Sequence, residues 1–344
     1  MQLAKKRIYY LDFLKVIATF FVIIIHVTAE NWYTASNNLY WIVNNSYNAV
    51  SRWSVPVFVM VSGALFLSRD IPVKRIFTKY IPRIMMILLV WGLYYWLYST
   101  NNWTIQNLWD SFIKLCNGES YSHLWYLYML IGLYLVTPIL RVFVKNADRK
   151  IIEYTILLFF VIQVVLPYIS GFVPEFMSFY NQLKIFPLAE YMIYYLGGYY
   201  FSQYDLSRFK RFLLYISSVI SLFAEMIYID LISYRQGTPI SGCGTFSIGT
   251  FLIAFSIFIF AHRLESVLTR FTAIKRIISF LSPLTFGIYL LHFRIEKLFV
   301  SFGLNSNFIH PILGVPLITI LVFLVAGLIV YLLLKIPYIR KLVQ

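Results

Sequence analysis

Long apolar segments of eighteen or more residues recur along the chain from Tyr9 to Pro337, and only short polar stretches separate them. A segment of this length crosses the hydrocarbon core of a bilayer as a helix, because lipid offers no partners to unsatisfied backbone groups. The segments lack the alternating pattern of outer-membrane barrel strands. The sequence therefore predicts an all-α integral membrane protein. The polar stretches are too short for further domains, so we expect one domain over residues 1–344.

The composition supports a membrane environment, because 60% of the residues are hydrophobic and only 12% are charged. A soluble fold with this composition would expose large apolar surfaces to water. About ten transmembrane helices fit the hydropathy pattern. The expected spans are 9–29, 50–68, 81–99, 122–142, 151–169, 186–203, 212–232, 245–262, 278–298 and 312–335.

The basic residues indicate how the chain is oriented. With the N-terminus in the cytoplasm, 22 of the 29 lysines and arginines fall in inside segments, 6 fall outside, and Lys15 lies within the first span. This asymmetry predicts that both termini are cytoplasmic. It also accounts for the net charge of +15 without a nucleic-acid partner, so membrane lipid is the expected surrounding partner. The basic start resembles a signal peptide, but Asp12 and Lys15 interrupt the apolar run, and we expect it to remain as the first helix.

The longest connections on the outer side are polar and rich in asparagine or aromatic residues. They are 30–50, 100–121, 170–185 and 299–311. Such segments either hold a sugar, through aromatic faces and amide groups, or are ordinary connecting loops. The two cysteines, Cys116 and Cys243, lie far apart, and we expect each to pack as a small apolar residue rather than to form a disulfide.

The first span carries Asp12, Lys15 and His26, with Glu30 at its outer end. Eleven residues on a helix turn through about 1100°, so Lys15 and His26 share a face about 16 Å apart along the axis. One interpretation is structural: Asp12 and Lys15 neutralise one another, and His26 makes a polar contact within the bundle. The other is functional: a cation near the cytoplasm and a deep imidazole, oriented by Glu30, join an anionic donor to an outward acceptor.

Four segments, which lie in the family's order between residues 9 and 293, resemble the bacterial acyltransferase type 3 family. Lys15 and His26, with ten residues between them in DFLKVIATFFVIIIH, match the family's basic-residue and histidine spacing. The other three are VPVFVMVSGALFL, followed by a basic loop and RIMMILLVWGLYY; HLWYLYMLIGLYLVTPIL; and LSPLTFGIYLLHF. Lys15 departs from the family, which more often has arginine there, and a lysine provides a point charge instead of a bidentate fork.

The resemblance implies a membrane-bound O-acyltransferase of the bacterial cytoplasmic membrane. It would move an acyl group, acetyl in the expected case, from cytoplasmic acyl-CoA to a hydroxyl of an extracytoplasmic cell-envelope carbohydrate. His26 would then be the general base with Glu30 orienting its ring, or it would carry a covalent acyl group. Lys15 would hold the donor or stabilise negative charge. The alternatives are an exporter of polysaccharide or small molecules and a noncatalytic sensor or assembly partner.

Further residues have both a functional and a structural interpretation. The cytoplasmic cations Arg75, Lys79 and Arg83 either bind the phosphates of coenzyme A or set the topology. Four residues either contact the substrate or only pack within the bundle: His123, Trp125, Tyr289 and His292. We expect Gly63 to let two helices pack closely. His262 and His310 fall at the ends of expected spans, and we assign them no role. No cluster has metal-ligand spacing, so we expect no metal.

Overall fold

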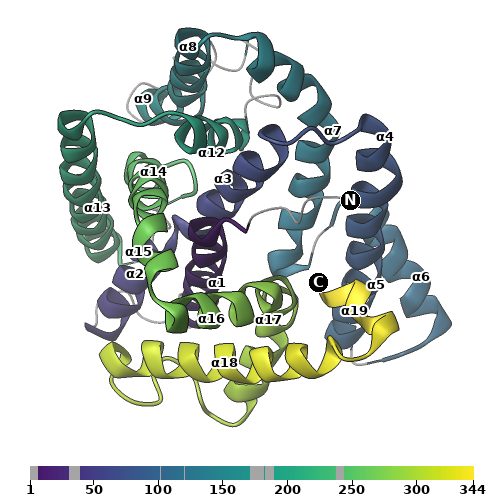
Figure 1. The fold of residues 1–344 in the computed structure, drawn as a ribbon. Coiled ribbons are helices and arrows are strands. Elements are labelled where there is room, and N and C mark those ends of the chain that lie inside the picture. Colours follow the sequence, from purple (N-terminus) through teal and green to yellow (C-terminus); the bar gives the residue numbers. More distant parts are fainter. Residues whose placement is uncertain are drawn as a thin grey trace.

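The computed structural model describes residues 7–30, 39–100, 102–119, 121–170, 190–237 and 244–344, together with residue 182. Every regular element in these ranges is a helix (Figure 1). Nine helical stretches in the described ranges are long and apolar enough to cross a membrane. They are Tyr9–Ala29, Leu39–Leu67, Val73–Thr100, Trp125–Asn146, Arg149–Ile169, Arg208–Gln236, Ile248–Arg270, Thr272–Ser301 and Pro311–Leu333. The predicted all-α multi-pass class is confirmed.

Helix α1 (Tyr9–Ala29) lies at the centre of the bundle (Figure 1). Its contacts include α2 (Leu39–Ser51), α3 (Ser54–Leu67), α14 (Ile248–Arg263), α17 (Thr285–Ser301) and α18 (Pro311–Leu333). The other long helices are α5 (Ile81–Thr100), α7 (Trp125–Asn146), α8 (Arg149–Phe160) and α13 (Arg208–Gln236). Shorter helices and turns are α4 (Val73–Arg75), η1 (Ile76–Tyr80), η2 (Ser122–Leu124), η3 (Val161–Val165), α9 (Leu166–Ser170), α15 (Glu265–Arg270), α16 (Thr272–Leu281), η4 (Ser282–Leu284) and α19 (Pro337–Val343). The polar residues of α1 are therefore surrounded by protein on several sides.

The expected span 186–203 corresponds to α12 (Met192–Gln203), and residues 183–189 lie outside the described ranges. Helices α12 and α3 meet at two glycines. A Cβ atom added to Gly63 would lie 1.9 Å from the Tyr195 carbonyl oxygen, and one added to Gly198 would lie 1.9 Å from the Met60 carbonyl oxygen. Small residues let helix backbones approach this closely. The expected packing role of Gly63 is confirmed.

Helix α2 corrects the expectation of an outer loop over residues 39–50, and residues 31–38 of that expected connection lie outside the described ranges. Its asparagines are buried and bridge other helices, because amide groups inside a bundle need partners. Asn48 donates to Thr28 of α1 at 2.9 Å, and Asn45 donates to Asp230 of α13 at 2.6 Å. Asn44 donates to Asn307 at 2.9 Å. These amide nitrogens hold α2 against α1, α13 and the connection before α18, which gives the asparagines a structural role within the bundle.

Helix α6 (Ile105–Cys116) corrects the expected loop at 100–121, since it packs back along α5. The Leu115 side chain reaches Gly92, eight residues before the end of α5, and the Lys114 ammonium lies 4.3 Å from the centre of the Trp96 ring. The thiol of Cys116 is free and exposed, so the expected packing of this cysteine is wrong. Cys243 and most of 170–185 lie outside the described residues.

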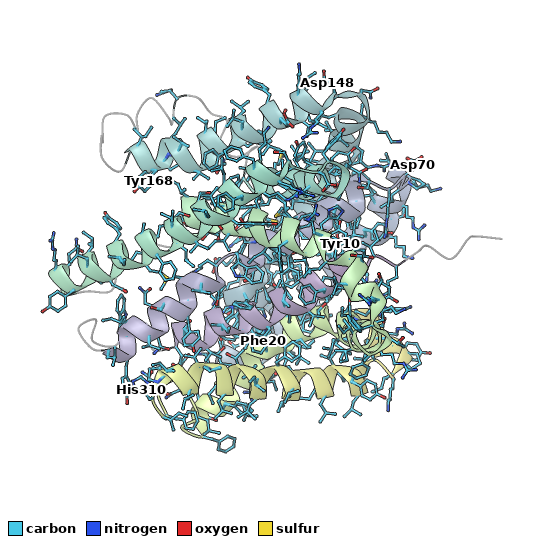
Figure 2. The ribbon with its side chains drawn as sticks, turned by 60° about the vertical axis from the view of Figure 1, so that its left-hand side comes forward. Tyr10, Phe20, Asp70, Asp148, Tyr168 and His310 are labelled. Atoms are coloured by element: carbon cyan, nitrogen blue, oxygen red, sulfur yellow. The ribbon has the colours of Figure 1, made fainter. Side chains whose placement is uncertain are left out.

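The ends of the helices agree with the predicted threading. Figure 2 shows Asp70 and Asp148, from two connections expected inside, at one end of the bundle. Tyr168 and His310, which border connections expected outside, lie at the opposite end. The assignment of these ends to cytoplasm and exterior stays a prediction that rests on the basic residues.

Candidate active site

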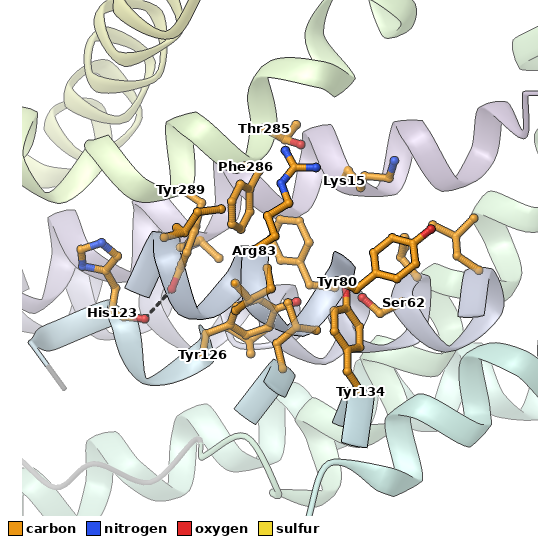
Figure 3. A pocket seen from close by; sticks show the side chains of 18 of the residues that line it. Lys15, Ser62, Tyr80, Arg83, His123, Tyr126, Tyr134, Thr285, Phe286 and Tyr289 are labelled. Carbon is orange, nitrogen blue, oxygen red and sulfur yellow. Dashed lines mark hydrogen bonds between the residues drawn. The ribbon is translucent and has the colours of Figure 1, made fainter. Parts of the chain in front are cut away.

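A cavity of about 350 Å³ lies between α1, α3, α5, α7 and α17. Its walls are mainly apolar, and a few polar side chains project into it. Figure 3 shows His123 and Lys15 on opposite sides of this space. Lys15 and His26 both line it, as their shared face predicts, with about 16 Å between them along the helix axis. The cavity is therefore long and has a cation toward one end and imidazoles toward the other.

Three histidine rings from three parts of the chain meet at the end of this cavity that lies away from Lys15. The ring centroids of His26 and His292 are 5.0 Å apart, those of His123 and His292 are also 5.0 Å apart, and those of His26 and His123 are 6.0 Å apart. His26 and His123 line the cavity, whereas His292 is fully buried behind them. Within the described ranges, no group of three His, Cys, Asp or Glu side chains is placed to hold a metal ion.

The hydrogen bonds of His292 identify which of its nitrogens carries the proton. Its Nδ1 lies 2.6 Å from the carbonyl oxygen of Tyr289, which can only accept, so Nδ1 donates. In a neutral ring Nε2 is then an acceptor, and this buried atom has no partner among the described residues. Tyr289 lines the cavity and donates its hydroxyl to the His123 carbonyl oxygen at 2.7 Å (Figure 3). An unpartnered buried nitrogen is uncommon and calls for an explanation, and a catalytic role is one such explanation.

Glu30 does not orient His26 in the structure. Its carboxylate accepts a hydrogen bond from Lys297 of α17 and forms an ion pair with it. A full positive charge attracts a carboxylate more strongly than a neutral imidazole does, which explains the choice of partner. The neighbour of the His26 ring is His292, which the spacing within the first span could not reveal.

Lys15 satisfies both interpretations of its charge. Its ammonium donates to Asp12 at 2.7 Å, the ion pair that the structural interpretation expects. It also lines the cavity, as the functional interpretation expects. Asp12 accepts two further hydrogen bonds, from Arg7 and from Ser282, the latter at 2.7 Å. An ammonium has three donors, so Lys15 keeps donors for a ligand after it has paired with Asp12.

A family model described as an acyltransferase domain matches residues 8–331 of the 344-residue chain. The chain belongs to the acyltransferase type 3 family. Searches of curated proteins and of solved structures found no match. The family, together with the nine apolar helices found in the described part of the chain, identifies a multi-pass membrane acyltransferase.

The other residues singled out from the sequence divide between the cavity and the surface. Trp125 lines the cavity of this acyltransferase, as does Arg83, whose guanidinium points toward Thr285 and Lys15 in Figure 3. Arg75 and Lys79 are exposed and do not line it. Of the three cations that the sequence places on the cytoplasmic side, Arg83 is therefore the one placed to contact a ligand inside the bundle.

Sequence reasoning missed much of the cavity wall. Tyr126 and Tyr134 of α7 line it, with Phe58 of α3, Tyr80 of η1 and Phe286 of α17. The chain has 28 tyrosines and 31 phenylalanines, so an aromatic residue by itself carries no signal. A spacing rule identifies residues that share one helix face, but it cannot show which helices meet.

Proposed function

We propose that this acyltransferase transfers an acyl group, acetyl in the simplest case, from cytoplasmic acyl-CoA to a hydroxyl of an extracytoplasmic carbohydrate of the bacterial cell envelope. One observation carries the proposal: a single cavity has cations toward one end and imidazoles toward the other. Donor and acceptor would approach from the two sides of the cytoplasmic membrane and meet near His26.

The dimensions of the cavity favour a donor that enters lengthwise. About 350 Å³ is near the lower limit of the roughly 300–1,000 Å³ typical of ligand pockets, enough for an acyl group and a flexible arm but not for a nucleotide as well. The pantetheine arm of coenzyme A is long and thin. Its thioester would reach the histidines while its phosphates stayed near Lys15 and Arg83.

The separation of Lys15 from His26 selects between two roles for the lysine. A group that stabilises the oxyanion must lie about 2.7–3.1 Å from it, whereas the two residues are about 16 Å apart along the helix axis. Lys15 therefore belongs to donor binding in this proposal. Arg83, on the opposite wall, would share that role.

His26 is the general base in the proposed reaction. It accepts the proton of the acceptor hydroxyl as the oxygen forms a bond to the thioester carbonyl carbon. The carbon–sulfur bond then breaks, and the departing thiolate of coenzyme A takes the proton that His26 accepted, which returns the imidazole to its neutral form. A relay through an acyl-histidine would use the same residue as nucleophile. Either route needs the ring to be held in place, which the proposal assigns to His292 in place of Glu30.

The test is thioester consumption by the purified protein in lipid nanodiscs, with acetyl-CoA and a cell-envelope glycan fraction. His26→Ala should lower the rate by about 10²–10⁴-fold or more, because the proton acceptor is lost. His310→Ala is the matched control, since His310 caps α18 away from the cavity and should keep normal activity. Glycan flux in proteoliposomes without thioester consumption would instead establish an exporter.

A further inference from the structure

A second cavity, of about 380 Å³, adjoins the first at the end away from the histidines. The two share Lys15 and Leu65, so Lys15 stands at the boundary between them. The residues before α1, its first two turns, the end of α3 and the segment after α3 supply the walls of the second cavity. Its full lining is Arg7, Ile8, Leu11, Asp12, Lys15, Leu65 and Arg69. Four of these seven side chains are charged, in contrast to the mainly apolar first cavity.

The charges of this second cavity leave a net positive site. Three cations, Arg7, Lys15 and Arg69, surround one acid, Asp12. Asp12 binds Arg7 and Lys15 and accepts a further hydrogen bond from Ser282, so its carboxylate fixes the positions of two of the cations. An anion that enters the cavity therefore meets positive charge already oriented toward it, with little ordering of side chains required.

Arg69 is the cation of this cavity whose side chain has no partner among the described residues. Its side chain is half-buried two residues after α3, and it makes no hydrogen bond or ion pair with the other residues that the structure describes. The neighbouring Asp70 is not available, because it pairs with Arg141 and Lys145. Arginine presents a planar fork that binds phosphate through two parallel hydrogen bonds. A half-buried arginine in a net positive cavity is suited to that ligand.

We propose that this cavity binds a phosphate or diphosphate group, with Arg69 as its principal partner and Arg7 and Lys15 completing the site. The inference deepens the proposed function and rests on it: the group is the phosphate portion of the acyl-CoA nucleotide. The boundary at Lys15 then lets the pantetheine arm pass into the first cavity toward His26. The site replaces the exposed Arg75 and Lys79 as the main phosphate contacts.

The experiment compares coenzyme A with pantetheine, which lacks the nucleotide and its phosphates. Binding of each is measured by calorimetry to the protein in nanodiscs of phosphatidylcholine. Arg69→Gln should weaken coenzyme A binding about 10–100-fold, the loss expected for hydrogen bonds to a charged group, and leave pantetheine binding unchanged. The affinity of Arg69→Lys for coenzyme A should lie between that of Arg69→Gln and that of the unaltered protein. Arg75→Gln, an exposed arginine of the same end, should bind coenzyme A like the unaltered protein.

Thermal unfolding of each variant shows whether it is folded. If Arg69→Gln does not fold, Arg69→Lys is used for the same comparison. Unchanged coenzyme A affinity in folded Arg69→Gln would overturn the proposal. A lipid headgroup offers the same phosphate chemistry, so binding is repeated in phosphatidylglycerol nanodiscs. Loss of bound phosphatidylglycerol in Arg69→Gln with unchanged coenzyme A affinity would overturn the nucleotide assignment. Arg69-dependent binding of inorganic pyrophosphate by a protein that consumes no thioester would support the phosphate site and reject the proposed function.

Discussion

The imidazole rings of His26 on α1 and His292 on α17 lie 5.0 Å apart between their centroids. His292 is held from behind by the hydrogen bond from its Nδ1 to the Tyr289 carbonyl oxygen, so its ring has a fixed orientation. The His26 ring packs against the His292 ring, and the ring centroids of His26 and Phe293 are 5.6 Å apart. We infer that His292 positions His26 rather than contacting the substrate, because it is buried and does not line the cavity.

The positioning role of His292 predicts a specific kinetic change. His292→Ala should lower kcat by up to about 10²-fold, since a shift of about 1 Å in a catalytic group has an effect of that size. The KM for acyl-CoA should stay nearly constant, because His292 is outside the cavity. His292→Asn, whose amide can replace the Nδ1 donor, should recover part of the rate. A variant in which KM rises and kcat is unchanged would instead assign His292 to substrate binding.

The contact of α3 with α12 predicts unequal effects of two glycine substitutions. Gly63→Ala should lower the stability of the bundle by about 1–3 kcal/mol or more, because the new methyl group would meet the Tyr195 backbone and the helices would have to separate. Gly132→Ala is the control: nothing lies within 4 Å of a Cβ added there, so stability should hold or rise slightly. Thermal unfolding in detergent measures both. Equal melting temperatures for the two variants would contradict the close approach.

The first helix shows which side-chain positions helical periodicity can predict and which it cannot. The period of a helix determined that Lys15 and His26 share a face, and both line the cavity. The same rule failed for Glu30, because Lys297, 267 residues away, competes for its carboxylate. Such long-range partners depend on which helices pack together, and local periodicity carries no information about that.

The outer connections show a different source of error. The asparagines of α2 have the polarity expected of loop or sugar-binding residues, yet Asn44 and Asn48 lie four residues apart on one buried helix face. Their spacing is that of one helix face, but polar residues at this spacing are not expected to be buried. The three-histidine cluster could not be anticipated in this way, since its members belong to α1, η2 and α17.

The orientation predicts which thiols an impermeant reagent reaches. Cys116 is free and exposed at the end of α6, in a segment assigned to the exterior. In a Cys243→Ser background, a membrane-impermeant maleimide should label Cys116 in intact cells. Asn146→Cys, exposed at the end of α7, should be labelled only after the membrane is opened. The reverse pattern would place both termini outside.

The structure sharpens the test of Lys15, the residue that departs from the family pattern. Lys15→Met should insert and fold, because Asp12 keeps hydrogen bonds from Arg7 and Ser282, but it should lose acyl-CoA binding and transfer. Lys15→Arg should retain measurable activity, since it preserves the positive charge at the boundary of the two cavities. The double variant Asp12→Asn with Lys15→Met separates charge neutralisation from donor binding, because it removes both members of the Asp12–Lys15 pair. Arg7 also loses its carboxylate partner, but its side chain is 36% exposed and does not become a buried unpaired charge. We expect it to match the unaltered protein in membrane expression and to remain inactive. Full activity of the double variant would reduce Lys15 to a partner of Asp12 and remove it from the donor site.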